Sequence, residues 1–363
     1  MAKIIISGGG TGGHVFPAIA IADAIKKIRP DADILFVGAK GKIEMEKVPK
    51  AGYPIEGLWI SGFHRKLTLR NLLFPLKLLM SMWKAYRIVS RFKPDVAVGV
   101  GGYASGPLLR AATSRGVPAL LQEQNSFAGV TNRLLAGKAK KVCVAYEKME
   151  RYFPAEKIVL TGNPVRRDLA ALKVTAAEGL KHFDLANGKK TIFVFGGSLG
   201  ARSINEAMAA NAGLLERQTD VQVLWQAGSL YYETYKDCET ARLPNVRLVA
   251  FIDRMDLAYA MADLVICRAG ALTISELCLV GKAALLVPSP NVSEDHQTKN
   301  ARALVEKEAA LLLPDGDAKE LIMAQALQLL NNEPQLEKLR QNIRLLARPD
   351  AAERIAEEVL NML

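Results

Sequence analysis

Two glycine-rich segments of this chain have the composition of anion-binding loops, and each directly follows an apolar run. The run 3–7 leads into Gly8-Gly9-Gly10-Thr11-Gly12-Gly13, the first glycine loop, and the run 191–195 leads into Gly196-Gly197-Ser198-Leu199-Gly200, the second glycine loop. An apolar run of about five residues predicts a buried parallel strand, and the glycines let the backbone present N–H groups at the start of the next helix. One such loop is a weak signal, because glycine after a strand also closes ordinary turns. Its recurrence predicts two nucleotide-binding halves.

Glu276 belongs to a third segment of this kind. The apolar run 264–267 is followed by Arg268-Ala269-Gly270-Ala271-Leu272-Thr273, and Glu276 falls inside the helix expected next. A carboxylate near the start of such a helix can accept hydrogen bonds from both hydroxyls of a ribose, while small residues before it let a ligand approach the backbone. A glutamate there is also an ordinary favourable partner of the helix dipole. The residues alone leave both interpretations open.

Strands that alternate with helices must position these segments. We expect strands at 3–7, 33–37, 95–99, 118–121, 141–144 and 158–161, and again at 191–195, 221–225, 246–249, 264–267, 283–287 and 310–313. This alternation predicts two doubly wound α/β sheets, and a chain of 363 residues suits two domains. We expect these domains at 1–163 and 164–345, with a final helix in 346–363 that packs back on the N-terminal domain.

The first glycine loop also fits the G-x-G-x-x-G pattern of nicotinamide-dependent oxidoreductases. Those enzymes hold a ribose with an acidic residue at the end of the second strand, but here that strand ends in Gly38-Ala39 and Asp33 stands at its beginning. Asp31 and Asp33 mimic an Asp-x-Asp metal motif, yet they precede the strand that such a motif follows. We therefore expect neither NAD, nor a metal ion, nor another cofactor.

The net charge of +11 is concentrated in one segment. Between Gly57 and Pro94 there are eight basic residues and no acidic one, interleaved with leucine, methionine and tryptophan. A bilayer span needs about 20 uninterrupted apolar residues, and Pro75 and Lys77 interrupt this run. The composition is typical of an anchor on an anionic membrane surface, and equally of a core helix with a solvated basic face. Nucleic-acid binding is less favoured, because no groove-binding motif accompanies the charges.

Seven motifs together resemble those of the MurG family, within glycosyltransferase family 28. They are the segments 9–18, 99–107, 122–125, 162–166, 196–202, 268–273 and 295–301, and they follow the family's order along essentially the whole chain. The resemblance implies a GT-B fold, that is, two Rossmann-like domains with parallel sheets separated by a deep cleft.

The resemblance also implies an activity. This is inverting, metal-independent transfer of N-acetylglucosamine from UDP-N-acetylglucosamine to the C4 hydroxyl of the N-acetylmuramoyl group of undecaprenyl-linked lipid I, which forms the β-1,4 link of lipid II in peptidoglycan synthesis. By position, the donor would contact Thr11, Gly12, Gly13, Asn125, Arg166, Ser198, Ile252, Ala271, Leu272, Thr273, Glu276 and Gln297. The acceptor would contact Gly10, Gly102, Tyr103 and Ser105.

His14 is the candidate general base, because it follows the first glycine loop and an imidazole titrates near neutral pH. It could instead hydrogen-bond the donor or order the loop, and His296, beside a donor position, is a second choice.

The polyprenyl tail of lipid I favours the membrane interpretation of the basic segment. Leu79, Trp83 and Lys84 would then attach a peripheral enzyme to the cytoplasmic face of the bacterial inner membrane. Four cysteines without a C-x-x-C pair, and an apolar strand that begins at residue 3, fit a cytosolic chain without a secretion leader. Two alternatives stay open: a GT-B transferase that acts on another membrane lipid, such as diacylglycerol, and, less favoured, a nicotinamide oxidoreductase. No nucleic-acid partner is expected.

Overall fold

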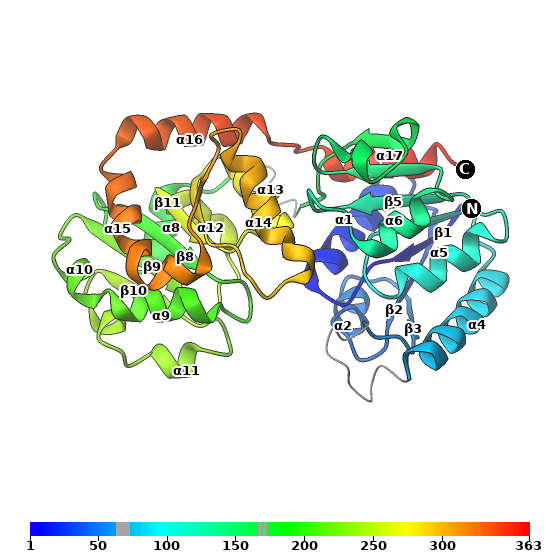
Figure 1. Ribbon diagram of the computed structural model, residues 1–363, viewed down its shortest axis with the longest axis horizontal. Coiled ribbons are helices and arrows are strands. Elements are labelled where there is room, and N and C mark those ends of the chain that lie inside the picture. The colour runs from blue at the N-terminus through cyan, green and yellow to red at the C-terminus, as the bar shows by residue number, and fades with distance from the viewer. Residues whose placement is uncertain (63–72, 166–168, 170–172) are drawn as a thin grey trace. The chain divides into compact units, whose positions relative to one another are not determined.

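The chain divides into two compact units, each of which is an α/β structure (Figure 1). The computed structural model describes residues 1–62, 73–165, 169 and 173–363. The first unit is Met1–Arg166 together with Arg348–Leu363, and the second is Arg167–Ala347. The cleft expected between the two domains stays a prediction.

The described part of the first unit contains a seven-stranded sheet in which every neighbouring pair is parallel. Its strands are β1 (Lys3–Ser7), β2 (Asp33–Ala39), β3 (Ile55–Leu58), β4 (Val96–Gly99), β5 (Ala119–Glu123), β6 (Lys141–Val144) and β7 (Ile158–Leu160), in the order β3-β2-β1-β4-β5-β6-β7. Ile4, Ile5 and Ile6 of β1 are fully buried, as expected of a central strand covered on both faces.

Strand β3 is the element that the sequence analysis missed. It pairs with β2 at the edge of the sheet, with Phe36 opposite Ile55 and Ala39 opposite Leu58. Pro54 directly precedes this strand and Gly57 lies within it, and both residues disfavour an interior strand. An edge strand tolerates these two residues because it pairs on one side only. The pairing with β2, and not the local sequence, therefore makes this segment a strand.

The helices of the first unit cover both faces of its sheet (Figure 1). They are α1 (Gly12–Ile28), α2 (Glu44–Lys50), α4 (Phe74–Phe92), α5 (Ser105–Thr113), α6 (Val130–Ala136) and α17 (Ala351–Leu360). Helix α17 returns from the end of the chain and packs on α1. Its buried Ile355 and Val359 join the same core cluster as Ile21 and Ile25, so the apolar face of this last helix is covered within the first unit.

The described part of the second unit contains a six-stranded parallel sheet with the order β10-β9-β8-β11-β12-β13. The strands are β8 (Lys190–Phe195), β9 (Val221–Gln226), β10 (Val246–Val249), β11 (Leu264–Cys267), β12 (Ala283–Leu286) and β13 (Leu311–Leu312). The helices are α8 (Ala176–His182), α9 (Arg202–Ala210), α10 (Ala212–Glu216), α11 (Tyr232–Tyr235), α12 (Met255–Met261), α13 (Ala271–Val280), α14 (His296–Val305), α15 (Ala318–Leu330) and α16 (Glu333–Leu345). The predicted fold class, two Rossmann-like domains with parallel sheets, is confirmed.

In both sheets the strand order reverses beside the central strand. The connections lead one way from β1 through β2 to β3 and the other way from β4 onward, and the same reversal separates β9 and β10 from β11 around β8. Ligands of doubly wound sheets bind outside the carboxyl ends of the strands at this point. The segments that follow β1, β4, β8 and β11 are therefore where a site is expected.

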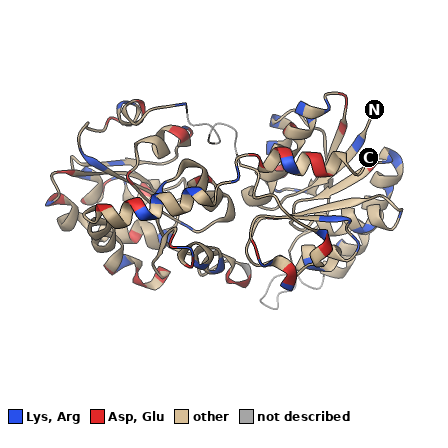
Figure 2. Cartoon of the chain, turned by 90° about the horizontal axis from the view of Figure 1, so that it is seen from above, with Lys and Arg blue, Asp and Glu red and all other residues tan. Residues whose placement is uncertain are grey.

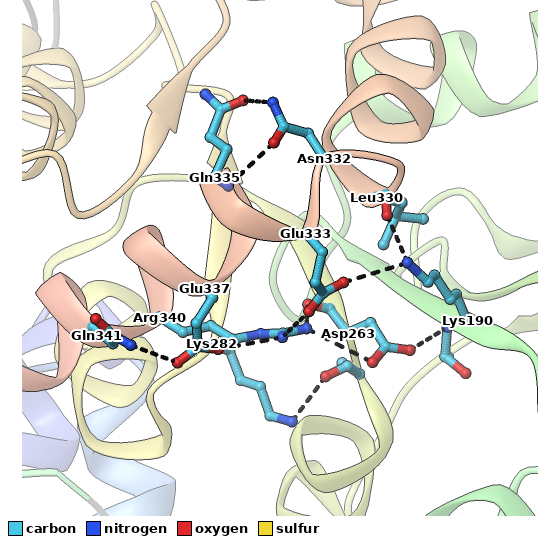
Figure 3. Close-up of polar contacts among 12 residues, drawn as sticks. Lys190, Asp263, Lys282, Leu330, Asn332, Glu333, Gln335, Glu337, Arg340 and Gln341 are labelled. Carbon is cyan, nitrogen blue, oxygen red and sulfur yellow. Dashed lines mark hydrogen bonds and ion pairs between the residues drawn. The ribbon is translucent and has the colours of Figure 1, made fainter.

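The amino edge of the second sheet carries a charged network instead. Basic and acidic residues are distributed over both units (Figure 2), but here their side chains converge at the start of three strands (Figure 3). Lys190 Nζ lies 3.4 Å from Glu333 Oε2, and Arg340 Nη1 lies 3.1 Å from Glu333 Oε1. Lys282 donates to the carbonyl of Ala262 at 2.8 Å. These contacts join α16 and the end of α12 to the strand starts.

Candidate active site

His14 lies in the first turn of α1, directly after the first glycine loop. Thr11 is the N-cap residue of this helix and has extended backbone angles. The His14 N–H donates to Thr11 O at 3.1 Å, and His14 Nδ1 lies 3.2 Å from Thr11 Oγ1. The first contact fixes the backbone and the second orients the ring. His14, which is half buried, is therefore held by Thr11 of its own loop.

The segment after β4 packs against this loop and requires glycine. Gly101 and Gly102 have φ angles of +92° and +87°. A Cβ added at Gly101 would lie 2.7 Å from His14 Cδ2, and one added at Gly102 would overlap the carbonyl of Gly9. Glycine is needed here both for the left-handed backbone and for space. The backbone of the first glycine loop and the backbone of the segment after β4 are thus in direct contact beside His14.

The other two expected acceptor residues after β4 lie in different environments. Tyr103 is half exposed, and its ring covers the first glycine loop, since a Cβ at Gly10 would lie 3.7 Å from it. Ser105 is fully buried, and its hydroxyl donates to Ser7 O at 3.0 Å and to Gly101 O at 2.8 Å. Ser105 therefore shapes the segment, and contact of either residue with the acceptor stays a prediction.

A buried glutamate organises the segment that follows β5. The Glu123 carboxylate accepts hydrogen bonds from the N–H groups of Asn125 and Gly129, both at 3.0 Å, and from Asn132 Nδ2 at 2.9 Å. Burial raises the pKa of Glu123, and these hydrogen bonds oppose the rise. The carboxylate fixes the backbone of Asn125, the expected donor-sugar contact, at the carboxyl edge of the first sheet.

Buried amide side chains form a hydrogen-bond network that connects three segments at the carboxyl edge of the first sheet. Gln122 Nε2 donates to Asn163 Oδ1 at 2.9 Å, Asn163 Nδ2 donates to Gln124 O at 3.0 Å, and Gln124 Nε2 donates to Val100 O at 2.8 Å. The network joins the segments after β4, β5 and β7. Arg166, the expected diphosphate contact three residues beyond Asn163, lies outside the described residues.

In the second unit, the second glycine loop packs on the segment after β9. Gly197 and Gly200 have φ angles of +90° and +89°. A Cβ at Gly200 would overlap the carbonyl of Ala227, and Gln226 Nε2 donates to Gly197 O at 3.0 Å. The loop is held by neutral amides and leaves Ser198 exposed at its tip. It has the form expected of a phosphate-binding loop.

Helix α13 brings a second group of expected donor residues to the same edge. Gly270 is its N-cap residue, and Ala271, Leu272 and Thr273 form the first turn. Glu276 follows on this helix, half buried, and Glu276 Oε2 accepts a hydrogen bond from Tyr259 OH at 3.0 Å.

Arg268 anchors the segment before α13. Its guanidinium donates to Val287 O at 2.9 Å and to Ser203 Oγ at 2.8 Å, and it pairs with Asp315.

The two remaining donor candidates follow β10 and β12. Ile252 is buried, whereas its neighbour Phe251 is half exposed. Gln297 lies in the first turn of α14, and its Oε1 accepts a hydrogen bond from the N–H of Ser289 at 2.8 Å. The described candidates are thus distributed over the carboxyl edges of the two sheets. Leu79, Trp83 and Lys84 lie apart from them on α4.

Sequence reasoning missed three residues at these edges: Glu44, Glu123 and Tyr259. Glu123 stands at the end of an apolar strand, where a charged residue is a signal for a specific role. Tyr259 lies in an apolar helix with no distinguishing pattern. Glu44 has an equivalent-looking neighbour in Glu46, and only the structure shows that the first is buried and the second is exposed.

Two kinds of feature are absent from the part of the chain that the structure describes. Residues 1–62, 73–165, 169 and 173–363 contain no group of three or more His, Cys, Asp or Glu side chains placed to hold a metal ion. Within the same ranges, no helix is both long enough and apolar enough to cross a bilayer.

Comparison with known proteins identifies the class to which this fold and these loops belong. Residues 4–144 match the glycosyltransferase family 28 N-terminal domain, and residues 191–355 match the glycosyltransferase family 28 C-terminal domain. The chain belongs to glycosyltransferase family 28.

The similar proteins carry the name of one enzymatic activity. The chain is 56% identical, over 99% of its length and 97% of the relative, to the UDP-N-acetylglucosamine–N-acetylmuramyl-(pentapeptide) pyrophosphoryl-undecaprenol N-acetylglucosamine transferase of Cytophaga hutchinsonii. It is 54% identical to the transferase of the same name from Bacteroides fragilis, over 99% of this chain and 95% of the relative. The crystal structure of Acinetobacter baumannii MurG has a TM-score of 0.81 at 30% identity and covers 99% of this chain and 100% of its own.

Proposed function

We propose that this chain transfers N-acetylglucosamine from UDP-N-acetylglucosamine to the C4 hydroxyl of the N-acetylmuramoyl group of lipid I, forming the β-1,4 link of lipid II. The observation that carries this proposal is the identity of 54–56% to transferases named for this reaction, over 99% of the chain. Such identity includes the acceptor segments of the first unit as well as the donor segments of the second. It favours lipid I over another membrane lipid as acceptor.

His14 is the proposed general base. The C4 oxygen of the acceptor forms a bond to C1 of the donor sugar, the bond from C1 to the β-phosphate oxygen breaks with inversion, and UDP leaves. The hydroxyl proton passes to the imidazole. Thr11 Oγ1 orients the ring through Nδ1 at 3.2 Å, so Nε2 is the nitrogen proposed to take the proton. Histidine suits this step, because the ordinary pKa of an imidazole lies near neutral pH.

We propose that hydrogen-bond donors of the protein, and not a metal ion, stabilise the negative charge that develops on the leaving UDP. The second glycine loop packs closely on Ala227 at Gly200, and the N-terminal turn of α13 starts at the N-cap residue Gly270, so both segments are held in place by the fold. Preorganised donors of this kind stabilise a developing anion more than mobile solvent does. Arg166 and Ser198 are proposed to bind the diphosphate, and Glu276 the ribose.

Helix α4 is proposed to attach the enzyme to the cytoplasmic face of the bacterial inner membrane. Its C-terminal half is anchored by buried Ala85, Ile88 and Val89, whereas Leu79 and Trp83 are 69% and 60% exposed. The helix therefore has both a core face and an exposed apolar face. Lys84 donates to the carbonyl of Gly57 at 2.8 Å, which ties α4 to the end of β3. We therefore assign the membrane contact to the exposed apolar side chains and not to Lys84.

The proposal is tested by transfer of labelled N-acetylglucosamine to a short-chain lipid I analogue in the presence of EDTA. Wild type should retain transfer, and His14→Ala should lose it. His182→Ala, at an exposed histidine of α8, is the matched control and should behave as wild type.

Two results would contradict parts of the proposal. Loss of transfer with EDTA would refute metal independence. A folded, UDP-binding wild type that glycosylates diacylglycerol and not lipid I would refute the acceptor.

A further inference from the structure

A buried carboxylate lies beneath the first glycine loop. Glu44, the first residue of α2, is fully buried. Its Oε2 accepts a hydrogen bond from the N–H of Gly10, and its Oε1 accepts one from the N–H of Ala39, both at 2.9 Å. One side chain therefore joins the loop after β1 to the end of β2.

Two glycines make room for this carboxylate. A Cβ added at Gly9 would overlap it, and a Cβ added at Gly38 would lie 2.5 Å from Glu44 Cγ. In the sequence these glycines resemble those that let a backbone approach a phosphate. In the structure, the atoms nearest to these two positions belong to a side chain of the same unit.

The carboxylate changes the electrostatics of the first loop relative to the second. The N–H of Gly10 already donates to an anion, and a second anion beside it would be repelled by Glu44. In the second glycine loop, the close contacts of Gly200 and Gly197 are with the carbonyl of Ala227 and the amide of Gln226, which are neutral. The two loops are similar in sequence, but the second provides more favourable electrostatic surroundings for a diphosphate.

Glu44 is connected to His14 through the loop that it holds. Gly9 and Gly10 precede Thr11, which caps α1 and contacts both the N–H and the ring of His14. The carbonyl of Gly9 also fills the space beside Gly102, next to the segment that lies against the imidazole. A shift of Gly9 and Gly10 would therefore move both supports of His14.

We propose that Glu44 is a positioning residue that holds the first glycine loop in the conformation that places His14, and that Gly10 serves this arrangement instead of binding the acceptor diphosphate. The proposal deepens the proposed function and rests on it.

The test compares Glu44→Gln with Glu46→Gln. Glutamine keeps the size of the side chain but replaces one accepting oxygen with an NH₂ group, so Gly10 or Ala39 loses its partner. Glu46 lies on the same helix, is exposed and pairs with Lys50 at 2.9 Å, so its substitution controls for changes in α2 itself. Glu44→Gln should lower kcat for transfer at least tenfold. UDP binding, measured by calorimetry, should stay within twofold of wild type, and Glu46→Gln should match wild type in both.

A second readout separates positioning from general stability. The imidazole resonances of His14, one of four histidines in the chain, can be followed by NMR. They should move in Glu44→Gln and not in Glu46→Gln, while those of His182 and His296 stay unchanged. If wild type does not transfer to lipid I, the proposed function fails, and the resonances still test Glu44.

Three outcomes would overturn the proposal. An unchanged kcat of the Glu44→Gln variant would overturn it, and so would unchanged His14 resonances in that variant. If Glu44→Gln does not fold, Glu44→Asp takes its place, because it keeps both oxygens and the charge but is one methylene shorter. Failure of both variants to fold would mean that Glu44 supports the whole unit and not the loop.

Discussion

The hydroxyl of Tyr259 donates a hydrogen bond to Glu276 Oε2 at 3.0 Å. Tyr259 is fully buried, and its ring meets those of Phe193 and Phe195 edge to face, with centroids 5.8 and 6.2 Å away. A ring held in this way has little freedom, so its hydroxyl offers Glu276 a fixed partner. Such a partner favours one orientation of the Glu276 carboxylate, as its proposed contact with a ribose requires.

Replacing Tyr259 with phenylalanine should weaken UDP binding about tenfold. The change removes one hydrogen bond to a charged group and keeps the ring, and such bonds contribute about 1.5–3 kcal/mol. Calorimetry with UDP and with 2′-deoxy-UDP measures the effect, and the variant should discriminate less between them. Tyr235→Phe, at a ring that packs on Trp225, is the control. A change of less than twofold in Tyr259→Phe would show that the tyrosine does not act through Glu276.

Polar substitutions on the exposed face of α4 should release the chain from anionic vesicles. The double variant Leu79→Ser and Trp83→Ser removes two apolar side chains that are mostly exposed, so the cost to folding should be small. Flotation with vesicles containing phosphatidylglycerol should show at least tenfold weaker binding, with UDP binding unchanged. Leu134→Ser, at a leucine of the first unit that is 78% exposed on α6, is the control. Equal flotation of the double variant and wild type would exclude α4 as the attachment site.

Replacing Asn205 with alanine should destabilise the second unit by about 2–3 kcal/mol. Asn205 Oδ1 accepts from Trp225 Nε1 at 2.9 Å, and Asn205 Nδ2 donates to Ala227 O at 2.8 Å, in buried surroundings. The variant leaves the indole N–H without its partner and frees the segment that supports Gly200. Urea unfolding followed by tryptophan fluorescence measures the loss. Asn342→Ala, which removes an exposed hydrogen bond, should change stability by less than about 0.5 kcal/mol. Equal effects of the two would contradict the prediction.

Lys282 should make stability rise with pH between about 8 and 10.5. Burial lowers the pKa of Lys282 from 10.5 to about 8, so the folded state loses the proton before the unfolded state does. Below pH 8 both states are charged and the folded state carries the cost of burying the charge. That cost disappears as the pH rises to 10.5, a gain on the order of 1–3 kcal/mol.

Urea unfolding at a series of pH values checks this prediction. The rise should be smaller in Lys282→Met than in wild type. It should be unchanged in Lys338→Met, at an exposed lysine paired with Glu308. The same rise in all three proteins would assign it to other groups.

The architecture, and the segments that lie at the carboxyl edges of the two sheets, could be predicted from the sequence alone. Short apolar runs such as 3–7 and 191–195 favour buried parallel strands, and the glycines after them mark the carboxyl edge. Order along the chain then places Ser198, Ala271 and Glu276 at one edge. These inferences need only the local pattern, which is why they succeeded. Strand β3 could not be predicted in this way, because its pairing with β2, and not its own composition, makes it a strand.

Which of the similar polar residues contacts which loop depends on the tertiary structure. Glu44 meets Gly10 across 34 residues, and Tyr259 meets Glu276 across 17. The hydroxyl of Ser105, an expected acceptor contact, donates a hydrogen bond to Ser7 O, 98 residues away. Such partners depend on the direction and burial of each side chain, and these are set by the packing of elements that lie far apart along the chain. The two glycine loops are alike in sequence, and folding places a carboxylate beneath the first and neutral amides beside the second.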